Sequence, residues 1–333
     1  MKLILERESM DNKEIYKRTL TFSLRRLAWD VMSIVVIIIL AAAGFILADK
    51  FASNGLVGLA IGIVIGIIIV AIASHFVAYL FKAGQIAMMT QGVSEGKLPN
   101  DVYAAGKKVV KERFLTVAAY YAATSVIKGI FEQIGNVITS VGRAVGGDAG
   151  GAVGGTISGV IQTIVGYLCD CCLGWVFYKK NEKAGKATLE GAVLFFKHGK
   201  TFAKNMGRVF GISLVSFVLI GGVFFGITYL ITMAFPDAFE ALRVSLVDMF
   251  SSEGNEVPAF LSNAQNVMLI TAGIGGVTMW AIIHSVFVRP FILVGVLRNF
   301  IESGKSEKIT ESDFDELDKK STKFKKLHAE TKA

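Results

Sequence analysis

Charge and proline are both scarce in this chain. Charged residues make up 19% of the 333 residues, whereas a soluble surface requires about a quarter. There are only 4 prolines, and together with the low polarity this argues against a disordered chain. Hydrophobic residues reach 53% and the mean hydropathy is +0.56. The fold class we expect is therefore all-α, as a polytopic integral membrane protein.

Cysteine and the motifs of known enzymes are also scarce. The 3 cysteines are Cys169, Cys171 and Cys172, which are too close together to build a disulfide framework or a zinc site. The chain contains no phosphate-binding glycine loop, no His-Glu-x-x-His and no Gly-x-Ser-x-Gly. We therefore expect neither an enzyme, a metal nor a cofactor.

Six segments are apolar enough to cross about 30 Å of hydrocarbon. The first 26 residues are charged throughout, so we expect no signal peptide there. We expect three helical hairpins in a membrane domain at 27–298, with a basic segment before it at 1–26 and a charged tail after it at 299–333. The predicted spans are 27–48, 55–81, 114–141, 156–178, 207–235 and 265–296.

Basic residues give the predicted orientation. If all six segments cross, then 1–26, 82–113, 179–208 and 289–333 share one side and contain 31 of the 35 Lys and Arg residues. Basic flanks remain in the cytoplasm, so both termini are predicted to be cytoplasmic. This distribution also explains the net charge of +8 without a nucleic-acid partner. We expect a plasma membrane, namely a bacterial inner membrane.

Glycines recur at four-residue spacing in two places. Residues four apart share a helix face, and glycine lets neighbouring backbones approach closely in lipid. Two interpretations follow: packing between helices of one chain, or a face that joins copies into a homo-oligomer. For the second row, a flexible outer loop at 146–155 is a third interpretation. The rows are Gly58, Gly62 and Gly66 in the second span and Gly147, Gly151, Gly155 and Gly159 near the fourth.

Polar side chains follow one face of the predicted third span. They are Tyr121, Thr124, Lys128 and Glu132, at three- and four-residue steps. Charges are costly in hydrocarbon, so this face is expected to meet protein or water. It either lines a polar path or forms a self-neutralised pair in which Lys128 extends to the interface.

His75, Asp170 and His284 form a second set of polar residues within predicted spans. They precede the basic flanks at Lys82, Lys179 and Arg289 by seven, nine and five residues. Histidine can carry a proton near neutral pH, and Asp170 could be its partner. The set is a candidate proton or ion site, and the alternative is that each histidine only bonds a backbone carbonyl.

The tail carries an amphipathic pattern. Phe314, Leu317, Phe324 and Leu327 share one face, with lysines around it. We expect a helix that docks on anionic lipid or on a cytoplasmic partner, or else a frayed, solvated tail. Beyond that, the lipid bilayer is the expected partner.

The stretch CCLGWVFYKKNEKAGKATLEGAVLFFKHGKTFAKN, residues 171–205, combines a Cys-rich span end, an Asn-bearing basic flank and a Phe-rich helix start. In this texture it resembles the choline transporter-like membrane proteins. The resemblance covers about a tenth of the chain and implies membrane transport, without a motif for substrate residues.

The leading functional prediction is passage of a small solute or ion through a polar path lined by the third span. The alternative is a non-transporting scaffold or assembly factor that uses glycine faces and the tail. An intramembrane enzyme of unrecognised type is third.

Overall fold

The computed structural model describes residues 10–52, 54–114, 124–130, 166–252, 254 and 256–332. Within helices it describes the backbone alone at 52, 75, 78, 79, 199–208 and 210. These residues form helices joined by short turns, with no strand among them. The chain divides into two compact units: unit 1 is Met1–Gly207 with Pro290–Ala333, and unit 2 is Arg208–Arg289.

Four helical stretches in the described residues are long and apolar enough to cross a membrane. They correspond to the first, second, fifth and sixth predicted spans. The predicted spans 114–141 and 156–178 lie partly outside the described residues, so six spans and the predicted orientation stay predictions. The four stretches are Asn12–Phe51, Gly55–Ser74, Gly211–Met233 and Ala264–Ser306.

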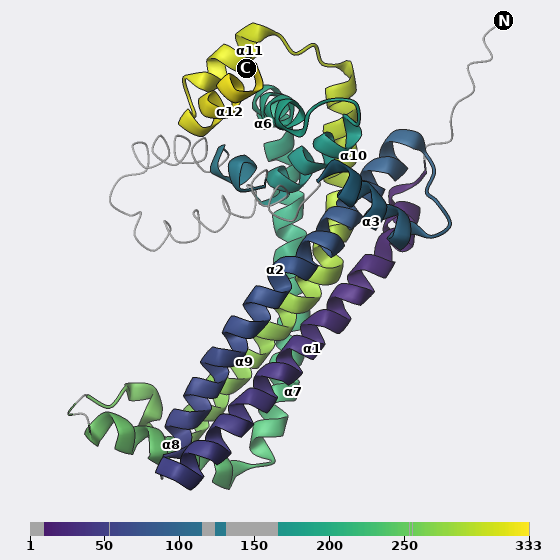
Figure 1. The fold of residues 1–333 in the computed structure, drawn as a ribbon. Helices are drawn as coiled ribbons and strands as arrows, with labels where there is room; N and C mark the ends of the chain where they lie inside the picture. Colours follow the sequence, from purple (N-terminus) through teal and green to yellow (C-terminus); the bar gives the residue numbers. More distant parts are fainter. Residues whose placement is uncertain are drawn as a thin grey trace, which may run out of the picture. The chain divides into compact units, whose positions relative to one another are not determined.

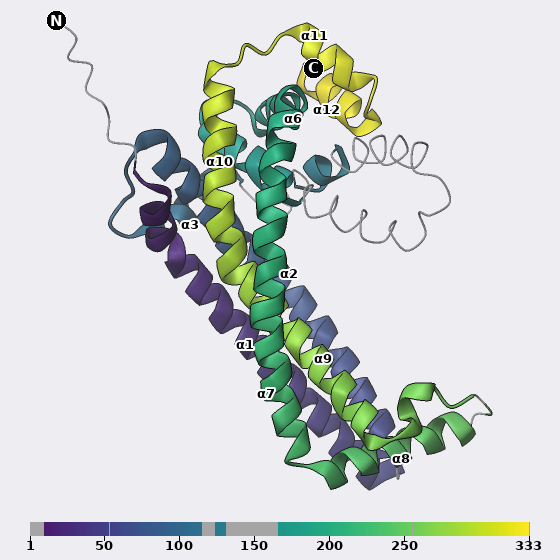
Figure 2. The ribbon, with the colours of Figure 1, turned by 180° about the vertical axis from the view of Figure 1, so that it is seen from behind.

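The first hairpin, in unit 1, consists of α1 (Asn12–Ala52) and α2 (Gly55–Glu95), which lie side by side (Figures 1 and 2). Glycine makes this approach possible. A Cβ atom on Gly58 would overlap the carbonyl oxygen of Gly44, and one on Gly62 would overlap that of Leu40. Lipid supplies no hydrophobic drive between helices, so this close contact is what holds the pair together.

Apolar side chains cover the outward surface of the first hairpin. They are large and half exposed, as a surface that meets lipid requires. Examples on α1 and α2 are Ile38, Ile46, Val64, Ile68 and Ile72.

The rest of unit 1 is a group of shorter and more polar helices, which we call the polar subdomain. It comprises the end of α2 from Lys82 onward, α3 (Val102–Arg113), the helical segments 124–130 and 166–178, the first part of α6 (Ala184–Ser216), and the C-terminal helices. Those are α10 (Arg289–Ser306), α11 (Glu311–Asp318) and α12 (Thr322–Lys332), of which residues from Pro290 onward belong to unit 1.

The helical segment 166–178 differs in its surroundings from the four stretches that are long and apolar enough to cross a membrane. Residues 170–177 are buried within unit 1 rather than exposed as a lipid-facing surface. Trp175 Nε1–H donates to Glu190 Oε2 over 3.2 Å. The guanidinium of Arg113 donates to the carbonyl oxygens of Lys179 and Glu182 beyond the segment's end. These bonds connect the segment and the turn after it to α6 and α3, so the segment is a buried helix of the polar subdomain.

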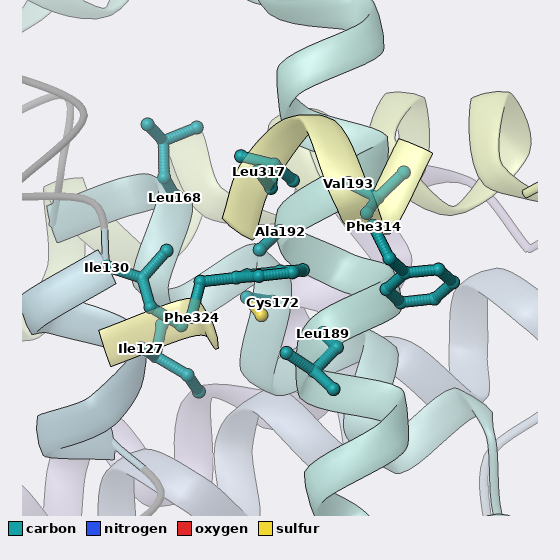
Figure 3. Close-up of a cluster of buried hydrophobic side chains, with 10 residues drawn as sticks. All are labelled: Ile127, Ile130, Leu168, Cys172, Leu189, Ala192, Val193, Phe314, Leu317 and Phe324. Atoms are coloured by element: carbon teal, nitrogen blue, oxygen red, sulfur yellow. The ribbon is translucent and has the colours of Figure 1, made fainter. Parts of the chain in front are cut away.

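The tail folds back into unit 1. A hydrophobic cluster joins α11 and α12 to segments 124–130 and 166–178 and to α6 (Figure 3). The predicted apolar face of the tail therefore packs on the chain itself: Leu317 and Phe324 have no exposed surface and Phe314 has 9%. The cluster consists of Ile127, Ile130, Leu168, Cys172, Leu189, Ala192, Val193, Phe314, Leu317 and Phe324.

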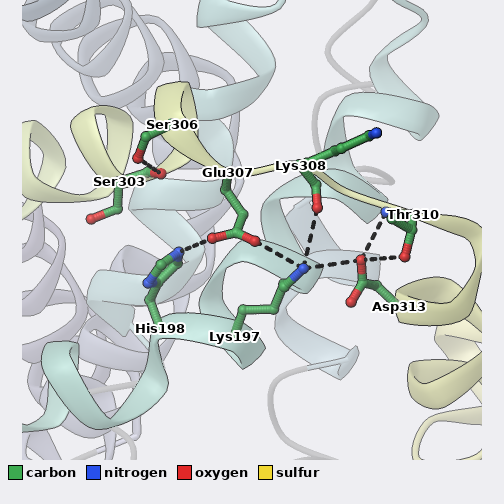
Figure 4. Close-up of polar contacts among 8 residues, drawn as sticks. All are labelled: Lys197, His198, Ser303, Ser306, Glu307, Lys308, Thr310 and Asp313. Carbon is green, nitrogen blue, oxygen red and sulfur yellow. Dashed lines mark hydrogen bonds and ion pairs between the residues drawn. The ribbon is translucent and has the colours of Figure 1, made fainter.

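An ion-pair network connects α6 to the start of α11 (Figure 4). Lys197 Nζ lies 2.9 Å from Glu307 Oε1 and 3.1 Å from Asp313 Oδ2, and His198 Nε2 lies 3.0 Å from Glu307 Oε2. Hydrogen bonding to Lys197 lowers the pKa of Glu307. Burial raises the pKa of Asp313, but hydrogen bonds from Thr310 and Lys197 outweigh it and hold that pKa below its usual value.

Unit 2 contains the second hairpin. Its first helix is the end of α6, the π-helical segment η2 (Phe217–Gly221) and α7 (Gly222–Met233). Its second is α9 (Ala264–Ile283) followed by the π-helical segment η4 (His284–Val288). The connection consists of α8 (Pro236–Ser252) and the short 3-10 helix η3 (Ala259–Ser262).

Candidate functional site

Both helices of the second hairpin change from α- to π-helix over five residues. The change occurs at Phe217–Gly221 in one helix and at His284–Val288 in the other. A π-helical turn is rare, occurs mostly as a single turn inside an α-helix, and is frequently found at functional sites. Two such turns in one pair of packed helices therefore mark a candidate functional site.

Four polar or aromatic side chains meet at these turns. Ser216 directly precedes η2 and His284 begins η4. Trp280 Nε1–H donates to Ser216 Oγ over 3.2 Å, and His284 Nε2 lies 3.1 Å from Ser213 Oγ. The Ser216 hydroxyl in turn donates to the Ser213 carbonyl over 2.7 Å. We call these four residues the Ser–His cluster.

Aromatic contacts enclose the Ser–His cluster. The rings of Phe217 and Trp280 meet edge to face with centroids 5.0 Å apart, and the rings of Trp280 and His284 are 5.2 Å apart. Ser216 is buried, whereas Ser213 and His284 are half-buried. Within unit 2 the imidazole is thus shielded on one side by Trp280 and bonded to a hydroxyl on the other helix.

Close backbone packing brings the two helices within reach of one another. A Cβ on Gly276 would lie 2.8 Å from the carbonyl oxygen of Gly221, the last residue of η2. A Cβ on Gly275 would lie 2.7 Å from Thr228 Oγ1. Glycine at these positions permits the short separation that allows Trp280 and Ser216 to bond.

The chemistry of the Ser–His cluster is that of proton and hydrogen-bond exchange. Imidazole accepts and releases a proton near neutral pH, and a serine hydroxyl both donates and accepts. Which partner donates between Ser213 and His284 depends on the imidazole tautomer. No group of three or more metal-ligating side chains exists among the residues that the structure describes. The imidazole, the indole N–H and the two hydroxyls of the cluster can exchange a proton or bond a small polar solute.

His284 is the member of the predicted histidine and aspartate set that lies in this cluster. Asp170 is buried in unit 1, and its carboxylate lies 2.7 Å from Lys82 Nζ. The predicted partner of Asp170 was a histidine, whereas the ion pair that the structure gives it is with a lysine. His75 lies in α2, and its side chain is outside the described part of the chain. Because His284 belongs to unit 2 and the other two to unit 1, the three are not brought together in one unit.

Two of the four residues of the predicted polar path fall in the described segment 124–130. Lys128 is exposed there, and the neighbouring Ile127 and Ile130 are buried in the cluster with Phe314 and Phe324. That cluster includes α11 and α12, whose many charges require water. Thr124 is half-buried, while Tyr121 and Glu132 lie outside the described residues. Lys128 thus lies in the polar subdomain as defined above, and the polar path along the third span stays a prediction.

Of the two predicted glycine rows, the structure describes one and the other lies outside the described residues. Gly58, Gly62 and Gly66 face α1, with Gly66 Cβ placed 3.1 Å from Ile37 Cα. This contact lies within one chain, which was the first of the two interpretations. The other row, Gly147, Gly151, Gly155 and Gly159, lies outside the described residues.

Three members of the Ser–His cluster were missed from the sequence: Ser213, Ser216 and Trp280. A signal for them exists, because Trp280 and His284 are four residues apart and Ser213 and Ser216 are three apart, which are same-face spacings. Spacing alone does not say which face meets which helix.

Comparison of the chain with protein-family models, with curated proteins and with solved structures gives no match. The resemblance of residues 171–205 to the choline transporter-like proteins therefore gains no support from relatives. What the structure supports directly is an all-helical chain with four helices able to span a membrane.

Proposed function

We propose that the protein mediates passage of a small solute or ion across its membrane, and that a proton is handled at the Ser–His cluster. The observation that carries this proposal is the hydrogen bond between His284 and Ser213 at paired π-helical turns. A titratable side chain within a membrane helix is costly and usually serves function. The cluster replaces the third span as the centre of the proposed path.

The proposal is tested by proton flux. The purified chain is reconstituted into liposomes that contain a trapped pH-sensitive dye, and a pH gradient is imposed under a potassium diffusion potential. We expect faster dissipation than in protein-free liposomes. His284→Gln should slow it by at least about tenfold, since the hydroxyls that remain do not titrate near neutral pH.

Ser74→Ala is the matched control, because it removes a tryptophan-bonded hydroxyl from the first hairpin and leaves the Ser–His cluster intact. Flux in the wild-type chain equal to that in empty liposomes would refute proton passage. Equal slowing by Ser74→Ala and His284→Gln would instead show that hairpin packing, rather than titration, sets the rate.

A second candidate is a membrane-anchored scaffold. The observation that favours it is the polar subdomain, in which α11 and α12 return to complete one hydrophobic cluster with segments 124–130 and 166–178. Connections between spans do not require such a core. If no flux is found, partner capture through this subdomain becomes the next experiment, with Phe324→Asp as the variant that disrupts it.

For location we propose a plasma membrane, such as a bacterial inner membrane, with both termini in the cytoplasm. The support is the concentration of Lys and Arg on the segments flanking the spans. Reporter domains fused at the C-terminus and in α8 should give opposite signals, and equal signals would refute this orientation.

A further inference from the structure

The helix α3 is an amphipathic helix attached to the first hairpin. It begins after Asp101, whose side chain accepts the backbone N–H of Ala104 over 2.9 Å. Val102, Gly106 and Val110 are its buried residues, at four-residue spacing. A Cβ on Gly106 would lie 2.9 Å from the carbonyl oxygen of Gly84, so this face packs closely on α2. Figure 2 shows α3 against the upper ends of α1 and α2.

The neighbouring face of α3 is basic. Tyr103, Lys107 and Lys111 follow each other at four-residue spacing and therefore share this face. At one end of it, the guanidinium of Arg25 lies over the Tyr103 ring, 4.1 Å from the centroid. The basic face of α3 is thus next to α1 at Arg25.

A shallow hollow of about 550 Å³ lies along this helix. Three lysines line it, against one acid: Lys108 lies 3.8 Å from Glu112. Lys107 and Lys111 have no ion-pair partner among the residues that the structure describes, and both are exposed. The hollow therefore has an uncompensated positive charge. Its lining residues are Ala104, Lys107, Lys108, Lys111 and Glu112.

The basic face lies close to the membrane boundary. Trp29 follows Arg25 by four residues, which is about 6 Å along a helix, and its indole N–H donates to Ser74 Oγ over 2.9 Å. Tryptophan is enriched where membrane meets water. Beyond it the exposed apolar surface of α1 begins, with Val31 51% exposed and Val35 48% exposed. The α3 helix packs against Phe22 and Gly84, which are seven residues from Trp29 in α1 and ten from Ser74 in α2, on the side away from the apolar surface.

We propose that the α3 surface formed by Lys107, Lys108 and Lys111 binds the phosphate of anionic phospholipid headgroups. The chemistry is complementary: primary ammonium groups bind phosphate, and juxtamembrane basic clusters bind anionic leaflets. A lipid is favoured over an acidic protein because the same helix pair presents the exposed apolar surface that lipid covers. The site does not depend on the Ser–His cluster.

The test is native mass spectrometry of the full chain in micelles that contain equal amounts of phosphatidylglycerol and phosphatidylcholine. We expect the wild-type chain to retain phosphatidylglycerol preferentially. K107Q/K111Q should lower that preference by about fivefold for each lysine removed. The matched control, K325Q/K326Q, removes the same charge from exposed lysines of α12 and should leave the preference unchanged.

Three results would overturn the assignment. One is an unchanged lipid preference in K107Q/K111Q at an unchanged melting temperature. Another is an equal loss in both double variants, which would show an effect of net charge alone. The third is displacement of phosphatidylglycerol by inorganic phosphate or by a poly-glutamate peptide at equal concentration, which would assign the surface to a free anion or to an acidic protein.

Discussion

The two hairpins of this protein share a way of packing and differ in what they add to it. Each has a tryptophan that donates to a serine on the partner helix: Trp29 to Ser74 over 2.9 Å, and Trp280 to Ser216 over 3.2 Å. Each also has a glycine, Gly62 or Gly276, at which an added Cβ would overlap a backbone carbonyl of the partner helix. These shared features are what a helix pair needs in lipid: close backbone approach and satisfied polar groups.

The differences separate the roles of the two hairpins. The second has two π-helical turns, and in it His284 lies within hydrogen-bond distance of Ser213 across the pair. The first runs as unbroken α-helix and belongs to the unit that contains the polar subdomain. Packing of the first pair therefore requires no π turn, which is why we propose function for the second hairpin and anchoring for the first.

The largest loss of stability is expected from adding a methyl group to a glycine that packs against the backbone of the neighbouring helix. Gly62→Ala would overlap the carbonyl of Leu40, and since backbone cannot move aside, it should cost about 3 kcal/mol of stability. Gly276→Ala should act in the same direction in the second hairpin. Gly226→Ala, with nothing within 4 Å of the new Cβ, should be neutral or stabilising. Thermal unfolding in detergent measures all three, and equal midpoints for Gly62→Ala and Gly226→Ala would contradict the packing.

The next effect concerns the ion pair between Lys82, near the end of α2, and Asp170 in the polar subdomain. Lys82→Met leaves the Asp170 carboxylate, whose side chain is 2% exposed, without this cation. The cost of breaking a buried pair is reduced here because Lys82 is 40% exposed, so we expect about 2 kcal/mol. Asp170→Asn should cost less, because it leaves the charge on the solvated partner. Chemical denaturation in micelles measures both, and the reverse order would refute this account.

A smaller effect on stability is expected from replacing the tryptophan of either hairpin, and the same variants test whether proton flux depends on the second hairpin. Trp29→Phe and Trp280→Phe each remove one hydrogen bond, so each should cost about 1 kcal/mol of stability. Their effects on proton flux should differ, because of these two tryptophans Trp280 belongs to the Ser–His cluster. Liposome flux and unfolding are measured on the same two variants. A flux defect of equal size in both would remove the distinction between the hairpins.

The smallest effect is expected in the polar subdomain. Glu307 and Asp313 have lowered pKa values in the folded chain, so they bind protons less readily there than when unfolded. Their contribution is present above the ordinary values of 4.5 and 3.8 and is lost as the pH falls through the lowered folded values. Lys197→Met should lower the unfolding midpoint at pH 7 and have little effect near pH 3. Asp315→Asn is the control, and an equal effect of Lys197→Met at both pH values would contradict the prediction.

Hydropathy predicted four segments that the structure shows as helices long and apolar enough to cross a membrane, because a run of apolar residues must be covered by something as apolar as itself. Hydropathy could not distinguish lipid from protein as that cover. Residues 170–177 belong to a predicted span, yet in the structure they are the buried core of the polar subdomain. Likewise, spacing predicted the apolar face of Phe314, Leu317 and Phe324, but not that the chain itself covers it.

Of the residues in the candidate site, only His284 was predicted from the sequence. His284 could be singled out because a titratable side chain in an apolar run is expensive. Its partners could not, because Ser213 and Ser216 are common in membrane helices and become informative only when placed opposite a histidine and a tryptophan. Asp170 was also singled out, because a charge within an apolar helix is costly. Its observed ion-pair partner is Lys82, a residue that the sequence indicated only as the basic flank of a span.

The sequence by itself determined that the chain is helical and has helices able to span a membrane. It also determined which charged or titratable side chains lie in apolar segments, where they are energetically costly. These properties depend on composition and on spacing along one helix, both of which are local. Tertiary structure decided which helix covers each apolar face and where His284, Asp170 and the glycines find their contacts. Those outcomes depend on distances between residues far apart in the chain, such as the 3.1 Å between Ser213 and His284, and no local pattern specifies them.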